Sequence, residues 1–412
     1  MFLPTMKIPA KVKKDYRLVL AASLSYGLTD GLLFITMALY VNDKSSGNLP
    51  MLGFISSLPF LAIFLMSFAW GAAADKLGSY KWLVVVGNFA TGILFFPMPY
   101  LTIYGLFIIR AIQVFFYSVN VLGVAMVTEM LPQSKGEGAG AVSLSTSVGW
   151  LVGGILSGAI YLYGGMFILF PLCGILSFVT GSMLIPMGKL DKPKAHITFR
   201  DTFNLTNGRV IGLMLVIICI TYIANRAVFT VFPVYLSDIH HLDALKIGLL
   251  TATAGVMGAI VVVAIGKYVD KAGRRPMFIF AVFSYLFIWI VLFLTDNLFA
   301  VMGVWMVPSW SFMSISATAM ISDLTTPSER GRGIGAFNSA LNLGQFMGAM
   351  LSGLVAAWIT PALPDAFGVH EFKGVWLFAS LLLIIPFALS FRVPETLKKG
   401  LRRLSKGKQE EE

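Results

Sequence analysis

The chain has 412 residues, of which 57% are hydrophobic and only 12% are charged. No soluble core could bury so much apolar surface, so this composition excludes ordinary water-soluble enzymes and binding modules and indicates a protein that crosses a membrane many times. The net charge of +11 would suit a nucleic-acid-binding protein, but the placement of the basic residues indicates membrane topology instead.

Twelve apolar stretches are long enough to cross a bilayer as helices, which needs about 20 residues each. Because twelve is an even number, both ends of the chain lie on the same side. The sequence therefore predicts an all-α membrane protein whose spans are residues 18–41, 49–70, 81–97, 102–127, 139–162, 165–187, 210–236, 246–266, 276–295, 298–321, 333–359 and 373–391.

Most lysines and arginines lie on the side that carries both termini. The opposite side has only Lys44, Lys246 and Lys373, and two further arginines fall within spans. Basic residues are retained in the short cytoplasmic loops of membrane proteins. We therefore expect both termini to be cytoplasmic and the chain to be a multi-pass protein of the plasma membrane.

One long polar connection separates the spans into two groups of six. The boundaries that follow are an N-terminal six-helix bundle (1–187), a cytoplasmic linker (188–209), a C-terminal six-helix bundle (210–391) and a basic cytoplasmic tail (392–412). We expect the two bundles to be related by pseudo-symmetry.

Glycine positions support this internal repeat. Nine glycines have another glycine 195 positions later, namely Gly53, Gly71, Gly78, Gly136, Gly138, Gly140, Gly149, Gly153 and Gly158. Six helices per copy place both copies in the same orientation, related by an axis along the membrane normal. Secondary transporters use this arrangement, with a solute site near the middle of the membrane between the halves.

The repeat includes a short polar turn after the second and eighth spans. The first copy reads Gly71-Ala-Ala-Ala-Asp75-Lys76-Leu-Gly78 and departs at Ser79 and Tyr80, and the second reads Gly266-Lys-Tyr-Val-Asp270-Lys271-Ala-Gly273-Arg274-Arg275. These turns resemble the signature loop between helices 2 and 3 of the major facilitator superfamily. The resemblance implies a twelve-helix transporter that alternates between inward- and outward-facing states, most like the drug/proton antiporter type.

Two roles are open for this turn. It is either a topological stop or a cytoplasmic latch, in which Asp75 lies against the amino-terminal end of helix 11, near Arg330 and Arg332. A helix N-terminus favours a carboxylate because its first amides lack partners within the helix. The repeat then places Asp270 at the start of the fifth span.

Few ionisable side chains lie deep within the spans, where each is costly unless it is paired or hydrated. These are Asp30 in the first span, Arg110 in the fourth and Arg226 in the seventh, beside Asn225. Asp30 is either a carboxylate that takes up a proton or binds a cation, with the arginines as countercharges or anion anchors, or one member of a static buried ion pair. Asp30 and Asn225 occupy equivalent positions in the repeat.

Two further stretches resemble family motifs in part. Arg110-Ala-Ile-Gln113 resembles the R-x-x-Q core found on helix 4 of proton-coupled members, and it departs at Val114. Gly149-Trp150-Leu-Val-Gly153-Gly154 resembles the helix-5 antiporter motif with tryptophan in place of proline. Small residues four apart also permit close helix packing, and that interpretation is the one we favour for span 5.

Aromatic residues on the helices that line the cavity in this family suit a bulky, partly apolar solute. Those we expect at the site are Phe116, Tyr222 and Trp305, and Pro308 is expected to break the tenth span. The leading function is therefore proton-coupled efflux of a lipophilic or drug-like molecule, and the alternative is proton-coupled uptake of a small metabolite, anionic or a sugar. The partners are a small molecule, protons and the lipid bilayer, with no nucleic acid, and the protein is expected to be a monomer.

Other functional classes have little support in the sequence. The sequence shows no nucleophile–base pair and no metal-ligand spacing of the kind that an enzyme would need. It also shows no soluble signalling domain of the kind that a receptor would carry. Cys173 and Cys219 fall within spans, so no structural disulfide is expected. No cofactor or metal is expected, because the four histidines lie in loops without ligand spacing: His196, His240, His241 and His370.

Overall fold

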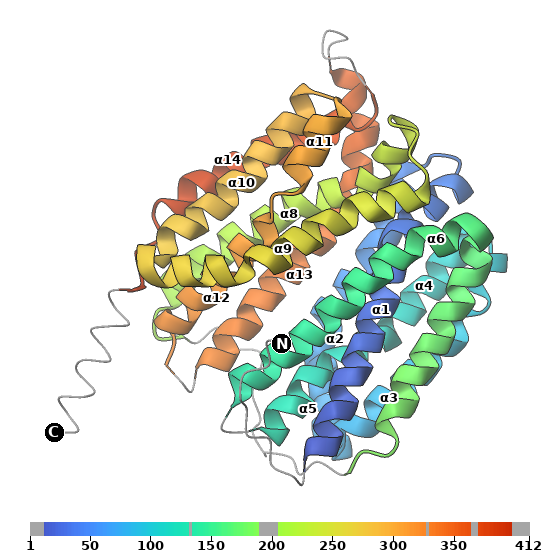
Figure 1. The fold of residues 1–412 in the computed structure, drawn as a ribbon, viewed down its shortest axis with the longest axis vertical. Helices are drawn as coiled ribbons and strands as arrows, with labels where there is room; N and C mark the ends of the chain where they lie inside the picture. Colours follow the sequence, from blue (N-terminus) through green and yellow to red (C-terminus); the bar gives the residue numbers. More distant parts are fainter. Residues whose placement is uncertain (1–11, 132–133, 189–204, 327–328, 364–369, 398–412) are drawn as a thin grey trace. The chain divides into compact units, whose positions relative to one another are not determined.

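The computed structural model describes residues 12–131, 134–188, 205–326, 329–363 and 370–397, and Figure 1 shows these residues as helices joined by turns. Most of the predicted linker and most of the basic tail lie outside the described residues. Those predictions therefore stay predictions.

The described part of the first half forms six α-helices and two short 3₁₀ helices. They are α1 (Lys13–Lys44), α2 (Leu49–Leu77), α3 (Tyr80–Phe95), α4 (Ile103–Tyr117), α5 (Leu122–Met130) and α6 (Lys135–Leu184), with short 3₁₀ helices at Met98–Tyr100 and Ser118–Val121. Those of the second half are α8 (Gly208–Asp238), α9 (Ala244–Ala272), α10 (Arg274–Leu294), α11 (Leu298–Trp305), α12 (Ser309–Leu324), α13 (Arg330–Trp358) and α14 (Lys373–Ser390), with a 3₁₀ helix at Thr360–Ala362.

Within the described residues, ten helical stretches are long and apolar enough to cross a membrane. One of them covers 48 residues, and the backbone of Gly165, with φ 56° and ψ −155°, breaks it into two of the predicted spans. Ala244–Gly258 is a shorter apolar stretch at the position of the eighth predicted span. The described helices thus account for the twelve spans that the sequence predicts.

Two spans are interrupted near their middle. The tenth is broken as predicted: α11 ends at Trp305, and α12 begins only after Pro308. The fourth contains the 3₁₀ turn Ser118–Val121 between α4 and α5, which the sequence analysis did not predict. No proline marks this second break, so its sequence signal is weak.

The polar turns are shorter than predicted. Residues from Gly71 to Leu77 continue α2, and the chain reverses only at Gly78, where φ is +69°. Likewise α9 continues to Ala272 and ends at Gly273, where φ is +108°. A glycine in the left-handed region is the usual helix stop, so the second glycine of each motif makes the turn and the first does not.

The helices form two compact units. Unit 1 comprises the described residues of Met1–Asn48, Leu58–His196 and Pro233–Ala252, and unit 2 those of Leu49–Ser57, Ile197–Phe232 and Thr253–Glu412. Each unit thus contains mainly one half of the sequence. Each also contains a short stretch of the other half, which is the start of α2 in unit 2 and the α8–α9 corner in unit 1.

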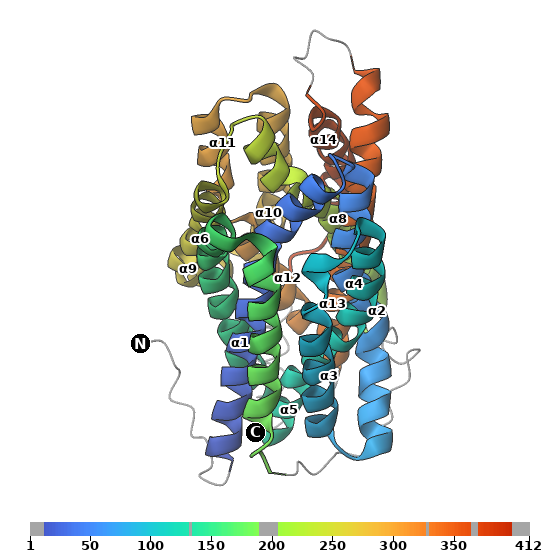
Figure 2. The same ribbon diagram turned by 90° about the vertical axis from the view of Figure 1, so that its right-hand side faces the viewer.

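In unit 1, α1 packs side by side with the first half of α6, as Figures 1 and 2 both show. A Cβ atom added at Gly149 or Gly153 would lie less than 3.0 Å from a backbone carbonyl of α1, belonging to Leu24 or Leu28. Gly27 and Gly31 of α1 meet α6 in the same way. The two backbones are therefore in direct contact, which confirms the packing interpretation of the span 5 glycines.

Unit 2 contains the equivalent contact between α8 and α13. A Cβ at Gly344 would lie 2.5 Å from the carbonyl oxygen of Cys219, and one at Gly348 would meet the carbonyl oxygen of Ile223. Gly344 and Gly348 are the repeat partners of Gly149 and Gly153. The sequence repeat is therefore also a repeat of helix packing.

The exchanged stretches are held by the same kind of contact. In unit 1, Gly158 of α6 lies against the carbonyl of Ala244, and in unit 2, Gly353 of α13 lies against the carbonyl of Leu49. These two contacts are also related by the repeat. Close backbone approach through glycine thus fixes both the long helices and the exchanged ends within each unit.

Adjacent glycines of α6 provide a direct test. We predict that Gly153→Ala destabilises the protein by about 1–3 kcal/mol, because the added methyl group collides with the α1 backbone. Gly154→Ala is the matched control, since nothing lies within 4 Å of a Cβ at that position. Thermal unfolding of the purified variants measures both. Equal melting temperatures would contradict the packing described above.

Candidate functional site

The deepest charges of unit 1 form one cluster between α1 and α4. The Nη1 atom of Arg110 donates a hydrogen bond to Oε1 of Gln113 at 2.5 Å, and the arginine side chain is only 6% exposed. The charge of Asp30 acts on Arg110 and on the neighbouring hydroxyls of Tyr26 and Tyr117. The structure thus brings together three residues that the sequence predicts for one site.

Two tyrosines complete this cluster. The Tyr117 hydroxyl donates to the carbonyl oxygen of Tyr26 at 3.2 Å, and the two ring centroids are 4.7 Å apart. The sequence analysis missed Tyr26, although its place one helical turn before Asp30 was a readable signal.

The cluster has donors left over. Nε of Arg110 and Nε2 of Gln113 have no hydrogen-bond partner among the described residues, whereas Asp30 itself is exposed. An unfilled buried donor costs about 1–3 kcal/mol, and such costs are typical of functional sites. A reachable carboxylate next to a buried guanidinium can gain or lose a proton with its countercharge fixed in place.

Phe116 does not join this cluster. Its ring is half-buried and makes an edge contact with Phe115 at 5.2 Å. Its carbonyl oxygen lies close to Gly87 of α3. Within the described residues, this phenylalanine packs against its own unit.

In unit 2, the residues predicted on α8 lie within about one helical turn of each other. Tyr222 and Asn225 are buried, and neither the tyrosine hydroxyl nor the Oδ1 atom of Asn225 has a hydrogen-bond partner among the described residues. Arg226 is half-buried, and its Cβ lies against Gly348. Tyr222 also makes an edge contact with Trp310, with ring centroids 5.8 Å apart.

Trp305 belongs to an aromatic stack rather than to an open surface. It is 5% exposed and lies parallel to Phe232, with centroids 3.8 Å apart and an angle of 7° between the rings. Phe229 contacts the same indole at 4.7 Å. The Nε1 atom of Trp305 has no hydrogen-bond partner among the described residues. Trp305 therefore packs α11 against α8.

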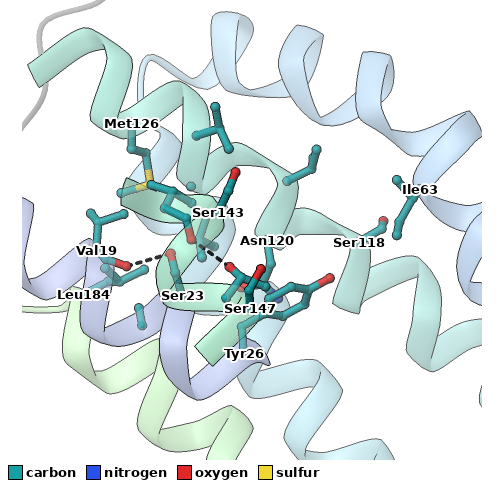
Figure 3. A pocket seen from close by; sticks show the side chains of 17 residues that line it. Val19, Ser23, Tyr26, Ile63, Ser118, Asn120, Met126, Ser143, Ser147 and Leu184 are labelled. Atoms are coloured by element: carbon teal, nitrogen blue, oxygen red, sulfur yellow. Dashed lines mark hydrogen bonds between the residues drawn. The ribbon is translucent and has the colours of Figure 1, made fainter. Parts of the chain in front are cut away.

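Unit 1 also contains a recess of about 320 Å³ that the sequence analysis did not predict (Figure 3). Its described lining has no Asp, Glu, Lys, Arg or His. Hydroxyl and amide side chains provide the polar part, namely Ser23, Tyr26, Ser118, Asn120, Ser143, Thr146 and Ser147. The spacing of Ser143, Thr146 and Ser147, which puts three hydroxyls on one helix face, was a usable signal. Tyr26 belongs to both this recess and the charged cluster.

No metal site is formed within the described residues. No group of three or more His, Cys, Asp and Glu side chains converges there.

The first polar turn is only partly described. Lys76 is exposed, and a Cβ at Gly71 would meet nothing within 4 Å, so this glycine is needed neither for the turn nor for close packing. The side chain of Asp75 lies outside the described part of the chain. Nearby, Nζ of Lys81 donates to the carbonyl oxygen of Met187 at 2.6 Å, which attaches α3 to the end of α6.

The second polar turn is anchored within unit 2. Arg274 forms an ion pair with Asp323 at 2.6 Å, and the backbone amides of Arg274 and Arg275 each donate to the carboxylate of Glu395 at 3.1 Å. Lys271 is exposed, and a Cβ at Gly266 would meet nothing within 4 Å. The Asp270 side chain, like that of Asp75, is outside the description.

Glu395 caps the first turn of α10. Burial raises the pKa of this carboxyl, but hydrogen bonds from the backbone amides of Leu397, Arg274, Arg275 and Thr396 outweigh burial and hold it below its ordinary value. The Thr396 hydroxyl donates to Asp323 at 2.9 Å and links the two carboxylates. The sequence analysis missed Glu395, because its partners lie 120 and 121 residues away.

The arginines at the start of α13 behave differently from each other. Arg330 is exposed, whereas Arg332 lies 3.9 Å from Glu329. Hydrogen bonds from the hydroxyl of Thr206 and from Thr326 lower the pKa of Glu329 to about 2. Glu329 thereby attaches the end of the predicted linker to the start of α13.

Comparison with protein families matches the chain to the Major Facilitator Superfamily over residues 19–211 and 214–410. An uncharacterized MFS-type transporter of Methanocaldococcus jannaschii is 22% identical over 359 residues, which cover 84% of this chain and 92% of the relative. The multi-drug resistance efflux pump PmrA of Streptococcus pneumoniae is 23% identical over 297 residues, or 68% of this chain and 73% of the pump.

Solved structures show the same fold. The nucleoside transporter NupG is similar with a TM-score of 0.74 at 14% identity, covering 92% of this chain and 99% of that one. A D-xylose-proton symporter is similar with a TM-score of 0.70 at 14% identity, covering 93% and 98%. The predicted architecture of two six-helix bundles is thereby confirmed.

The carboxylate cap on α10 gives a pH-dependent prediction. Glu395→Gln should lower stability by about 1 kcal/mol at neutral pH, because an amide accepts fewer amide hydrogen bonds than a carboxylate. The folded pKa lies below the unfolded one, so the stabilisation is complete at neutral pH and is lost as the pH falls through the folded value.

Melting temperatures of wild type and variant, measured from pH 7 down to about pH 3, check this expectation. The difference between them should shrink on acidification. Glu137→Gln is the control, because Glu137 is an exposed carboxylate in the first turn of α6. A difference that grows at low pH would contradict the capping role.

Proposed function

Because this chain belongs to the major facilitator superfamily, we propose that it is a proton-coupled secondary transporter working by alternating access. Family membership makes it a multi-pass membrane transporter of a small molecule. Coupling ion, solute and direction are the parts that we propose.

The observation that carries proton coupling is the cluster of Asp30, Arg110 and Gln113. Asp30 is exposed and is the residue that exchanges a proton, while Arg110 is buried with an unfilled donor and supplies a fixed countercharge. When Asp30 is ionised, the opposite charges attract across α1 and α4. Protonation removes that attraction and leaves Arg110 to find another acceptor, which gives the two protonation states different preferred arrangements.

Efflux of a lipophilic or drug-like molecule is the leading direction. The support is the relatedness to a multidrug efflux pump and the aromatic side chains near the polar groups, of which Tyr222 with its unpartnered hydroxyl is the clearest. Aromatic faces bind varied apolar solutes with little demand on exact shape.

Proton-coupled uptake of a small metabolite is the second candidate. The recess of unit 1 favours an uncharged metabolite over an anionic one, because its described lining carries hydroxyls and no arginine or lysine. Arg110 is a weaker anion anchor than the sequence suggests, since Asp30 already opposes its charge.

We propose that the protein lies in the plasma membrane and that both of its termini are in the cytoplasm. The support is the excess of basic residues on that side of the predicted spans. The polar turns, and with them Asp75 and Asp270, then face the cytoplasm, where a latch can form and release.

Coupling is tested by Asp30→Asn in reconstituted vesicles under an imposed pH gradient. We expect loss of gradient-driven solute accumulation, with counterflow exchange retained, because the amide keeps the shape but cannot carry a proton. Asp15→Asn is the matched control on the same helix, where Asp15 accepts a hydrogen bond from the amide of Gly188.

An unchanged pH dependence in Asp30→Asn would make this carboxylate purely structural. No solute movement in the wild type under any imposed gradient, across a mixed library, would remove the transport proposal for this chain.

The latch is tested by Asp75→Asn. We expect the variant to label more readily than wild type at a cysteine placed in the cytoplasmic half of α5, because a helix N-terminus attracts a carboxylate more strongly than an amide. Equal labelling rates with a membrane-impermeant maleimide would leave the turn as a topological stop only.

A further inference from the structure

The recess of unit 1 is lined by both polar and apolar side chains. Figure 3 shows Ser118 and Ile63 at one end and Val19, Met126 and Leu184 at the other, with Tyr26 and Ser147 between them. Its volume of about 320 Å³ lies at the lower end of the range for small-molecule sites.

Two hydroxyls of the recess already donate hydrogen bonds to backbone carbonyls. Ser23 donates to the carbonyl oxygen of Val19 at 2.8 Å, and Thr146 donates to that of Val142 at 3.0 Å. A hydroxyl that donates to the backbone keeps its lone pairs free. Ser23 and Thr146 therefore face the recess as hydrogen-bond acceptors.

Two other polar groups are already occupied by the protein. Asn120 exchanges amide hydrogen bonds with Asn88 at 3.0 and 3.2 Å, and it also donates to the carbonyl oxygen of Tyr117. Ser118 accepts from Nε1 of Trp70 and donates to the carbonyl oxygen of Phe115. These groups stiffen the wall and leave little capacity for a solute, so Ser23 and Thr146 provide its fixed polarity.

The apolar part of the wall comes from Val19, Ala22, Val84, Met126, Val142 and Leu184, and Tyr26, Ser143 and Ser147 add further hydroxyls to the polar part. A charged solute entering the recess would lose hydration and meet no opposite charge in the described lining, which is costly. An uncharged solute with hydroxyl or N–H groups would lose little free energy on entering, because Ser23 and Thr146 can accept hydrogen bonds from those groups.

We propose that this recess binds the transported solute through an uncharged part that presents hydroxyl or N–H donors to Ser23 and Thr146 and an apolar face to the aliphatic side chains of the lining. This inference rests on the proposed transport function and names the solute class for it. It also separates two tasks within unit 1: Asp30 and Arg110 handle the proton, and the recess handles the solute, with Tyr26 as the wall between them.

Gly123 of α5 offers a way to fill the recess without disturbing its frame. A Cβ at this position would meet only Oγ of Ser23, at 3.6 Å, which is an ordinary contact. A leucine there projects into the recess from a helical backbone that accepts it, and alanine is the smaller step.

The test uses four probes on one scaffold with the purified full-length chain. They are 4-hydroxybenzamide, its methylated counterpart 4-methoxy-N,N-dimethylbenzamide, 4-carboxybenzamide as the anion and 4-(aminomethyl)benzamide as the cation. Binding is measured by ligand-observed NMR and by thermal shift. We expect 4-hydroxybenzamide to bind and the other three to bind at least tenfold more weakly.

Variants then locate the binding. Thr146→Val and Ser23→Ala should each weaken 4-hydroxybenzamide roughly five- to tenfold, and Gly123→Leu should abolish binding. Ser182→Ala is the control, since Ser182 is exposed on α6 outside the recess lining. If Gly123→Leu does not fold, Thr146→Val and Gly123→Ala provide the same readout.

The assignment would be overturned if 4-hydroxybenzamide did not bind or if the anion or cation bound more tightly than it does. Equal binding of the methylated probe, or unchanged binding in Thr146→Val, would also overturn it. The outcomes separate from those of the transport proposal. If the protein transports solute but the recess variants bind the probe as wild type does, only the recess assignment is refuted. If binding depends on the recess but no solute is transported, only the transport proposal is refuted.

Discussion

The rest of this structure depends on direct backbone contact between helices through glycine. In unit 1 the contact joins α1 to the first half of α6, and in unit 2 it joins α8 to α13. Within a bilayer, water expulsion does not drive helices together, so close packing and the groups it brings into reach must stabilise the bundle. Where glycines alternate with carbonyls of the neighbouring helix, the two backbones meet with no side chain between them.

This contact determines which side chains can meet. Gly27 and Gly31 flank Asp30 on α1, so the carboxylate lies on a helix whose axial position is fixed by α6. The same contact brings Ser23 of α1 and Thr146 of α6 into the lining of one recess. A slide of α1 along α6 by one helical turn would break these glycine contacts and separate the hydroxyls. The proposed proton site and the recess are therefore both positioned by the contact between α1 and α6.

The repeat preserves packing and varies chemistry. The glycines recur at the same offset in both halves, whereas Asp30 corresponds to Asn225 and Arg110 corresponds to Trp305. The repeat counterparts of this charged pair in unit 2 are therefore a buried amide, Asn225, and an indole, Trp305, that stacks on Phe232. Two copies of one frame thus differ at the positions that we propose for proton coupling.

The sequence by itself determined the membrane environment, the twelve spans, the repeat and the helix break at Pro308, because hydropathy, glycine spacing and proline chemistry act over one or two helical turns. It also indicated that Asp30, Arg110 and Gln113 matter, because charge is rare in a span. Only the tertiary structure decided that Tyr117 meets Tyr26 beside them, that Glu395 caps α10 and that Ser23 and Thr146 share a recess. These groups are far apart in sequence, and their meeting depends on which helices lie side by side, which no local pattern encodes.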